Sequence, residues 1–179
     1  MKKYLYMIAA LFGIDYFCKE NIEAQKPEDF PRDMEKSHGK IRLYRNHNDG
    51  FCFGVKKEKK ELVRMVPVVF TSAAAGILTW LLCRDEGRKA DRIGFALITA
   101  GGLSTLYDRL KRGYVVDYFS IRCKYLEKVV FNLGDFFIFA GSALIAASDL
   151  LGAVRDLSSP SEDHIKALRL PWRKTDEAE

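Results

Sequence analysis

Four stretches of the chain are almost free of charge, and their lengths match membrane-spanning helices. Residues 65–83 and 93–107 contain no charged residue, and residues 4–18 and 129–148 contain one each. A helix on the surface of a soluble domain needs a polar face, whereas about 20 apolar residues in helical form can cross a bilayer. The pattern therefore predicts four spans, at about residues 3–22, 65–83, 91–108 and 129–150.

The polar segments between these spans predict the remaining architecture. Loop one (23–64) alternates loosely from Ile41 to Phe53, which predicts extended strand segments. Loop two (84–92) is short and carries four basic residues, whereas loops one and three carry eleven and six. Because long loops weigh little in the positive-inside rule, we place loop two and both termini on the cytoplasmic side. The expected fold is an all-α integral membrane protein with four transmembrane helices and a small extracytoplasmic extended segment in loop one.

The two ends of the chain receive separate interpretations. Two lysines and an apolar run at the start resemble a signal peptide, but Asp15 interrupts the run and no small-residue cleavage site follows. We therefore expect a retained first span and one membrane domain over residues 1–151. Residues 152–179 form a polar cytoplasmic tail, in which the capping signals at 159–162 predict a short amphipathic helix on the inner membrane surface.

Average composition conceals this segregation of charge. The chain has 179 residues, of which 48% are hydrophobic and 30% charged, and its mean hydropathy is −0.14. Four spans leave no length for a large multidomain enzyme. The net charge of +5 comes mostly from basic residues beside the apolar windows, where anionic lipid headgroups are the expected partner and nucleic acid is not.

The metal-binding residue types are not grouped. The three histidines are scattered, and the four cysteines include no C-x-x-C pair. We expect no metal and no cofactor. Cys18 and Cys83 close apolar windows as small apolar residues. Cys52 and Cys123 lie in polar loops, and the sequence leaves open whether they form a disulfide.

Two carboxylates near the membrane carry the chemistry that the residues suggest. Asp135 lies about two turns inside the fourth predicted span, where an isolated carboxylate needs a partner. Asp108 and Asp117, both beyond the third span, are the candidates, and Asp108 has Arg109 as its own neutralising neighbour. Two close carboxylates share one proton, which is the chemistry of an aspartic protease. Buried aspartates also serve proton relays in transporters, so both interpretations stay open.

Asp15 is the second ionisable residue inside an apolar window. Lys19 follows it by four residues, one helical turn away on the same face. The pair is either an intrahelical ion pair at the membrane interface or a contact for the substrate, and the spacing does not separate these.

Five short motifs, in chain order from residue 4 to about 150, resemble those of signal peptidase II, the bacterial lipoprotein signal peptidase. They are Asp15 with Lys19 (D-x-x-x-K), residues 48–54 (N-x-G-A-A-F), Asp108-Arg109 (D-R), residues 115–118 (V-V-D-F) and residues 131–135 (F-N-x-A-D).

This resemblance implies a four-span aspartic endopeptidase of the bacterial inner membrane. It would remove signal peptides from prolipoproteins, cutting just before a cysteine that bears a diacylglyceryl group, and it would work as a monomer among membrane lipids. Asp117 and Asp135 would be the catalytic pair. The residues that would lie near the site or position the substrate or the pair are Asn48, Gly50, Asn132, Arg109, Asp108, Asp15 and Lys19.

The chain also departs from the family pattern. Thr105 stands where the family has an asparagine, which changes one hydrogen bond to the substrate. Gly134 stands where alanine is usual. Thr105 keeps a second function open, a catalytically weak paralogue that binds lipoproteins or lipids as a membrane adaptor. A small proton-coupled transporter ranks last, since only Asp135 comes near the middle of a span.

Overall fold

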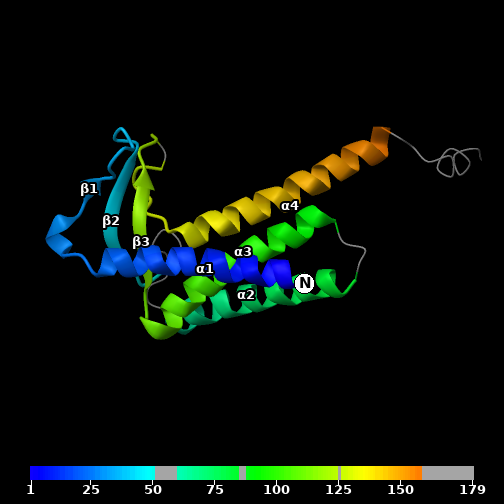
Figure 1. Ribbon diagram of the computed structural model, residues 1–179, viewed down its shortest axis with the longest axis horizontal. Helices are drawn as coiled ribbons and strands as arrows, with labels where there is room; N and C mark the ends of the chain where they lie inside the picture. The colour runs from blue at the N-terminus through cyan, green and yellow to red at the C-terminus, as the bar shows by residue number, and fades with distance from the viewer. Residues whose placement is uncertain (51–59, 85–87, 125, 159–179) are drawn as a thin grey trace, which may run out of the picture. The chain divides into compact units, whose positions relative to one another are not determined.

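The computed structural model describes residues 1–50, 60–84, 88–124 and 126–158 (Figure 1). It contains the helices α1 (Lys2–Glu23), α2 (Lys60–Cys83), α3 (Lys89–Lys111) and α4 (Leu133–Ser158), the short 3₁₀ helix η1 (Pro27–Asp29), and the strands β1 (Arg32–Asp33), β2 (Ile41–Asn48) and β3 (Val115–Ile121). Contacts divide the chain into two units, Met1–Ile145 and Ala146–Glu179, and the candidate site lies within the first. Cys52 and the predicted tail helix lie outside the described residues.

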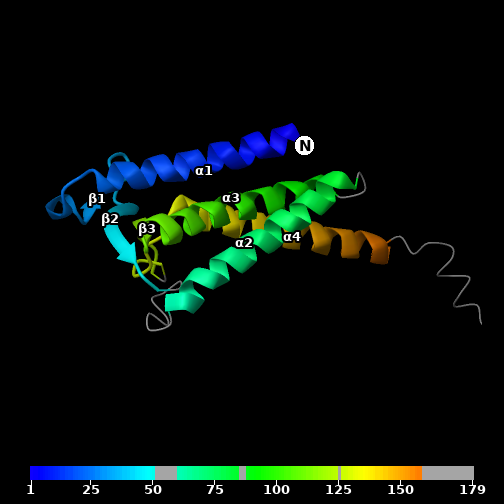
Figure 2. The ribbon, with the colours of Figure 1, turned by 90° about the horizontal axis from the view of Figure 1, so that it is seen from below.

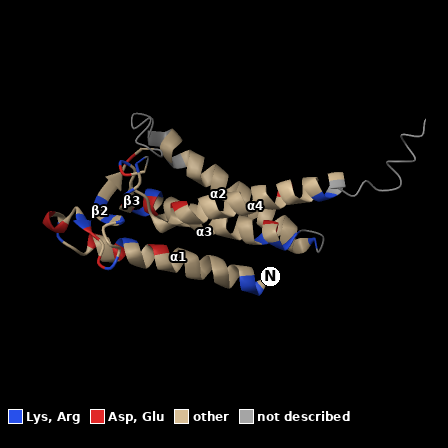
Figure 3. Cartoon of the chain, turned by 90° about the horizontal axis from the view of Figure 1, so that it is seen from above, with Lys and Arg blue, Asp and Glu red and all other residues tan. Residues whose placement is uncertain are grey.

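The four apolar windows all form helices. Within the described residues, the segments Met65–Cys83 of α2 and Leu133–Arg155 of α4 are long and apolar enough to cross a membrane. Charged residues gather toward the ends of the helices and on the sheet (Figure 3). Helices α1 and α3 have 22 and 23 residues but carry buried polar side chains, which lower their hydropathy.

The start of the fourth helix differs from the prediction. Helix α4 begins at Leu133, not at residue 129, because Phe131 pairs with Phe119 of β3 in an isolated β-bridge. Asn132 precedes the first helical residue and caps the helix. Asp135 therefore lies in the first turn of α4, and the prediction that it lies two turns inside the span is wrong.

Helix α3 is the centre of the helical packing. It contacts α1 and α2 and lies between them (Figure 2). Two glycines of α3 also allow close approach of α4. A Cβ atom added to Gly94 would lie 2.5 Å from Ile145, and one added to Gly101 would collide with the carbonyl of Gly134. Small residues are the usual means by which helices approach closely where both are surrounded by lipid.

A three-stranded antiparallel sheet, in the order β1-β2-β3, lies at the end where α1 and α3 finish and α2 and α4 start (Figure 1). Strand β2 confirms the predicted extended segment from Ile41 to Asn48, whereas residues 51–53 of that segment lie outside the described residues, and β1 and β3 were not predicted. Asn46 lies opposite Asp117 across β2 and β3. The amides of Tyr118 and Phe119 both donate to the carbonyl of Phe131, which is a β-bulge.

Candidate active site

Asp117 lies in the middle of β3, between two asparagine side chains. The amide of Asn48, on β2, donates to Oδ2 of Asp117 at 3.0 Å. The amide of Asn132 donates to Oδ1 at 2.8 Å. The Asp117 side chain is buried, so these two donors replace the water that would otherwise surround the carboxyl group. The two hydrogen bonds therefore fix the orientation of the Asp117 carboxyl group.

Asn132 also connects Asp117 to Asp135. Its Oδ1 accepts the backbone N–H of Asp135 at 3.0 Å, and Oδ2 of Asp135 accepts the backbone N–H of Asn132 at 3.1 Å. This reciprocal arrangement is a capping box at the start of α4. Because one asparagine holds both aspartates, the pair is brought together from β3 and the first turn of α4, 18 positions apart in the chain.

The surroundings of Asp117 change its acidity. Burial, together with the negative charge of Asp135, raises the pKa of Asp117 to about 6. The hydrogen bonds from Asn132 and Asn48 act in the opposite direction, as does the positive charge of Lys19. Asp117 therefore holds a proton in a substantial fraction of molecules in mildly acidic solution.

A cavity of about 280 Å³ adjoins Asp135. Residues of α2, α3 and the first turns of α4 line it, and its walls are mostly apolar. Its polar side chains are those of Asp135, Arg109, Thr105 and Thr71. The hydroxyl oxygen of Thr105 is buried and has no hydrogen-bond partner among the described residues. An extended peptide in this cavity would meet one carboxylate, one guanidinium group and one unused hydroxyl.

A buried charge cluster lies beside the pair. Lys19 Nζ lies 2.8 Å from Asp15 Oδ2 and 2.9 Å from Asp108 Oδ2, and all three side chains are at most 1% exposed. Lys19 also donates to Ser104, whose hydroxyl donates to Asp15 at 2.5 Å. Arg112 adds a contact to Asp108 at 3.1 Å. The cluster joins α1 to α3 with two cations and two carboxylates.

Asp15 extends this cluster to the start of α4. Its Oδ1 accepts the backbone N–H of Leu133 at 3.0 Å and the hydroxyl of Tyr118 at 3.0 Å. The Leu133 N–H also reaches the Tyr118 oxygen at 3.2 Å. Burial and the charge of Asp15 raise the pKa of Tyr118 above its ordinary value, so the hydroxyl stays a donor. The first N–H groups of α4, which have no partner within the helix, are thus held by Asp15 and Asn132.

We expect replacement of Tyr118 with phenylalanine to lower stability by about 1 kcal/mol. The ring would still fill its place, but Asp15 would lose one donor. Thermal unfolding of the purified protein in detergent measures the change. Tyr114→Phe is the matched control, since that ring stacks on His47 with centroids 4.0 Å apart and its hydroxyl makes no described hydrogen bond. Equal melting temperatures for the two variants would contradict the role given to the Tyr118 hydroxyl.

Arg109 does not neutralise Asp108, and this part of the sequence interpretation is wrong. Adjacent residues of a helix point about 100° apart, so Asp108 faces Lys19 of α1 while Arg109 faces β2. Arg109 donates to the backbone carbonyl of Asn48 at 3.2 Å and to that of Gly50. It thereby holds the end of β2, and with it the Asn48 amide, beside Asp117.

The structure also adds residues that the sequence interpretation did not name. Ser104 and Arg112 lie four positions before and after Asp108, on the same face of α3, so helical spacing could have indicated them. Nothing in the local pattern indicates Tyr118, because its partners lie on α1 and α4.

Comparison with known proteins places this arrangement in a family. The family model described as signal peptidase (SPase) II matches residues 7–151. The chain belongs to the signal peptidase II family. It is similar to the lipoprotein signal peptidase of Mesorhizobium japonicum, with 29% identity over 87% of this chain and 90% of that protein. It is also similar to that of Brucella ovis, with 33% identity over 65% of this chain and 71% of that protein.

Two solved structures of bacterial membrane enzymes have the same fold as this signal peptidase II family member. Each superposes with a TM-score of 0.70, at 19% and 18% identity. The first alignment covers 90% of this chain and 93% of the other, and the second covers 84% and 94%. The four helices and the sheet are therefore the fold of a known membrane enzyme, and family membership makes the chain a peptidase.

Gly134 is the departure from the family pattern that the structure explains. A Cβ atom at this position would lie 2.9 Å from Oδ1 of Asn132 and 3.2 Å from the carbonyl of Gly101. Glycine therefore lets α3 and the capping asparagine approach closely. In a relative with alanine here, these neighbours must shift by a few tenths of an ångström.

Proposed function

We propose that this protein is an aspartic endopeptidase of the bacterial cell membrane that removes signal peptides from diacylglyceryl-modified prolipoproteins. Asp117 and Asp135 are the catalytic residues. The observation that carries the proposal is their joint attachment to Asn132, which brings together two carboxyl groups from separate elements, one of which, that of Asp135, lines a cavity. Family membership supports the substrate, because the similar proteins are named lipoprotein signal peptidases.

The proposed reaction uses one protonated and one ionised carboxyl group. Asp135 takes a proton from water as the water oxygen attacks the scissile carbonyl carbon, and Asp117 gives its proton to the carbonyl oxygen. The tetrahedral intermediate then returns a hydroxyl proton to Asp117 as the C–N bond breaks. Asp135 delivers its proton to the leaving nitrogen. Both aspartates regain their starting states, and no metal or cofactor takes part.

Three neighbouring residues position the groups in this reaction. Asn48 and Asn132 fix the orientation of Asp117, and Arg109 holds the strand end that carries Asn48. Thr105 offers its hydroxyl to the peptide backbone of the substrate, in place of the amide of an asparagine. Asp15, Lys19 and Asp108 act indirectly, by holding α1, α3 and α4 in register around the pair.

All four helices cross the membrane in this proposal. The 22% and 6% buried shares of the two apolar segments support lipid contact, because a core helix of a soluble protein would be mostly covered. The charges of α1 and α3 near the sheet pair with one another or bind backbone, as membrane depth requires. The sheet and the cavity then lie at the outer bilayer surface, the enzyme acts as a monomer, and both termini are cytoplasmic.

Cleavage by the purified protein tests this function. A prolipoprotein with a diacylglyceryl group on its cysteine is incubated with the enzyme in detergent, beside the same prolipoprotein without lipid. Mass spectrometry of the products should show a new N-terminus at the lipid-bearing cysteine, and only for the modified substrate. Tight binding without any cleavage would instead support the membrane adaptor.

We expect kcat/KM to fall about tenfold per pH unit above pH 6, because Asp117 must keep its proton and its pKa is about 6. The hydrogen bond from Asn48 lowers that pKa, so Asn48→Ala should move the fall in rate to higher pH. Initial rates between pH 5 and 8 measure both effects. A profile that is flat above pH 6, or that moves to lower pH in Asn48→Ala, would contradict the assignment of the proton to Asp117.

A further inference from the structure

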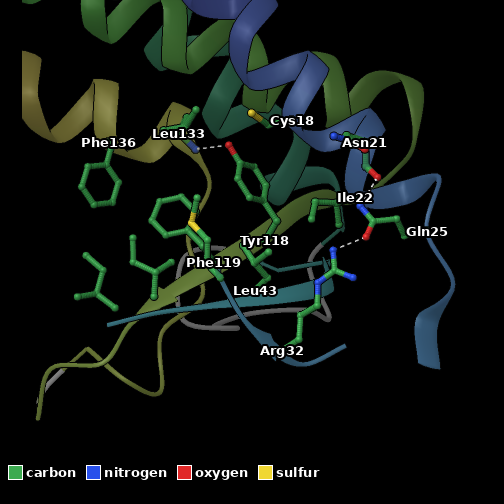
Figure 4. Close-up of a pocket in the computed structure, with 13 residues that line it drawn as sticks. Cys18, Asn21, Ile22, Gln25, Arg32, Leu43, Tyr118, Phe119, Leu133 and Phe136 are labelled. Carbon is green, nitrogen blue, oxygen red and sulfur yellow. Dashed lines mark hydrogen bonds between the residues drawn. The ribbon is translucent and has the colours of Figure 1, made fainter. Parts of the chain in front are cut away.

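A second cavity, of about 560 Å³, lies between the end of α1, the sheet and the first turn of α4 (Figure 4). Neither Asp117 nor Asp135 is among the residues that line it. Tyr118 and Leu133 form part of its wall, so it lies next to the contacts that hold α4 but apart from the carboxyl pair. The proposed peptidase reaction does not use this cavity.

The wall of this cavity is almost entirely apolar. The bulge in β3 turns the consecutive side chains Tyr118 and Phe119 toward it, where a regular strand would present only one of them. Along α1 the lining runs from Cys18 to Ile22, about 6 Å of helix, and Gln25 continues it just beyond the helix end. Phe136 contributes from α4 and is 39% exposed. An unbranched hydrocarbon chain fits such an apolar space better than a peptide, which carries polar groups that need partners.

The end of the cavity near the loop after α1 is cationic. Arg32 is exposed, its guanidinium group donates to Gln25 Oε1 at 2.5 Å, and it lies 4.9 Å from the centre of the Phe30 ring. No carboxylate among the described residues pairs with it, whereas Arg122, which is also exposed, pairs with Asp33 at 3.6 Å. Arg32 is therefore oriented by neutral neighbours and keeps donors for an anion.

We propose that this cavity binds one acyl chain of an anionic phospholipid and that Arg32 binds its phosphate. A membrane lipid is complementary to both parts of the site. Its apolar chain matches the apolar interior of the cavity, and its negative headgroup matches the cationic, exposed end. It would reach the cavity from the bilayer between α1 and α4, two of the helices that we propose to lie in the membrane. The bound chain would pack against Tyr118 and Leu133 and so support the start of α4.

Photolabelling of the full-length protein tests this site. The protein is placed in phosphatidylcholine nanodiscs with a trace of phosphatidylglycerol that carries a diazirine on one acyl chain. Labelling is mapped by mass spectrometry and expressed relative to that of Met65–Cys83, the apolar segment of α2, as an internal reference. We expect strong labelling within residues 18–25 and at Phe136. Arg32→Ala should lower it roughly tenfold, and Arg122→Ala should leave it unchanged.

A second variant and a second lipid complete the test. Leu43→Trp fills part of the cavity while Arg32 stays in place, so labelling of residues 18–25 should fall to the level of the reference segment. Equal labelling of the parent and both variants would overturn the proposal, and so would equal labelling by a phosphatidylcholine that carries the same diazirine chain. The readout is labelling and does not depend on cleavage. Asp117→Asn should therefore be labelled as strongly as the parent, even if it no longer cleaves substrate.

Discussion

Replacement of Asp117 or Asp135 with asparagine should lower kcat by at least about a thousandfold. An asparagine in place of Asp117 would have no proton to give to the carbonyl oxygen, and one in place of Asp135 could not accept a proton from water. Both substitutions keep the size of the side chain, so substrate binding should change far less than kcat. Cleavage of the diacylglyceryl-modified prolipoprotein under single-turnover conditions measures the effect on the chemical step.

Asp33→Asn is the matched control for the two catalytic variants. Asp33 lies on β1 of the same sheet, its carboxylate is 50% exposed, and it contacts only Arg122 among the described ion pairs. This variant should cleave at the parental rate. Melting temperatures of all three variants separate catalysis from folding, because an inactive variant that melts near the parent is inactive for a chemical reason. A rate within tenfold of the parent for either catalytic variant would refute the assignment.

The sequence was informative about the helices because their signal is local. A run of apolar residues long enough to cross a bilayer is visible without any knowledge of its neighbours. Strand β3 was not visible in this way. Its residues Val115 and Val116 are both buried, so the alternation expected of a half-covered strand is absent. Its partner β2 lies earlier in the chain by 67 positions at the pair Asn48–Val115 and by 80 at the pair Ile41–Ile121.

The carboxyl pair could be narrowed down from the sequence, but its geometry could not. Asp135 stood out as a charge in an apolar window, and the family resemblance selected Asp117 over Asp108 as its partner. The double role of Asn132 depends on where α4 begins. That boundary is set by the pairing of Phe131 with Phe119, which no helical or strand periodicity records. For the same reason Asp135 was placed too deep in the span.

The interpretation of Asp15 and Lys19 shows how far spacing alone can go. Four residues apart on a helix, the two could pair with each other or contact the substrate, and the structure shows that they pair. Spacing could not indicate that Asp108 lies against the same ammonium group, nor that the cluster is fully covered. Those facts change the expected effect of a substitution on stability. An ion pair at the surface contributes little to the free energy of unfolding, whereas removal of one partner from a buried pair is strongly destabilising.

Lys19→Met should therefore lower the free energy of unfolding by about 3–5 kcal/mol. Methionine keeps the length of the side chain but leaves the carboxylates of Asp15 and Asp108 without their shared cation. Thermal unfolding in detergent measures the loss. Arg122→Ala, which breaks the exposed pair with Asp33, should cost less than about 1 kcal/mol and serves as the control.

Double variants show which carboxylate accounts for more of the stability lost in Lys19→Met. Asp108 keeps the guanidinium group of Arg112 at 3.1 Å when Lys19 is lost, whereas Asp15 keeps only neutral donors from Ser104, Tyr118 and Leu133. Adding Asp15→Asn to Lys19→Met should therefore restore most of the lost stability, and adding Asp108→Asn should restore much less. Equal recovery in the two double variants would mean that the loss comes from packing and not from an unpaired buried charge.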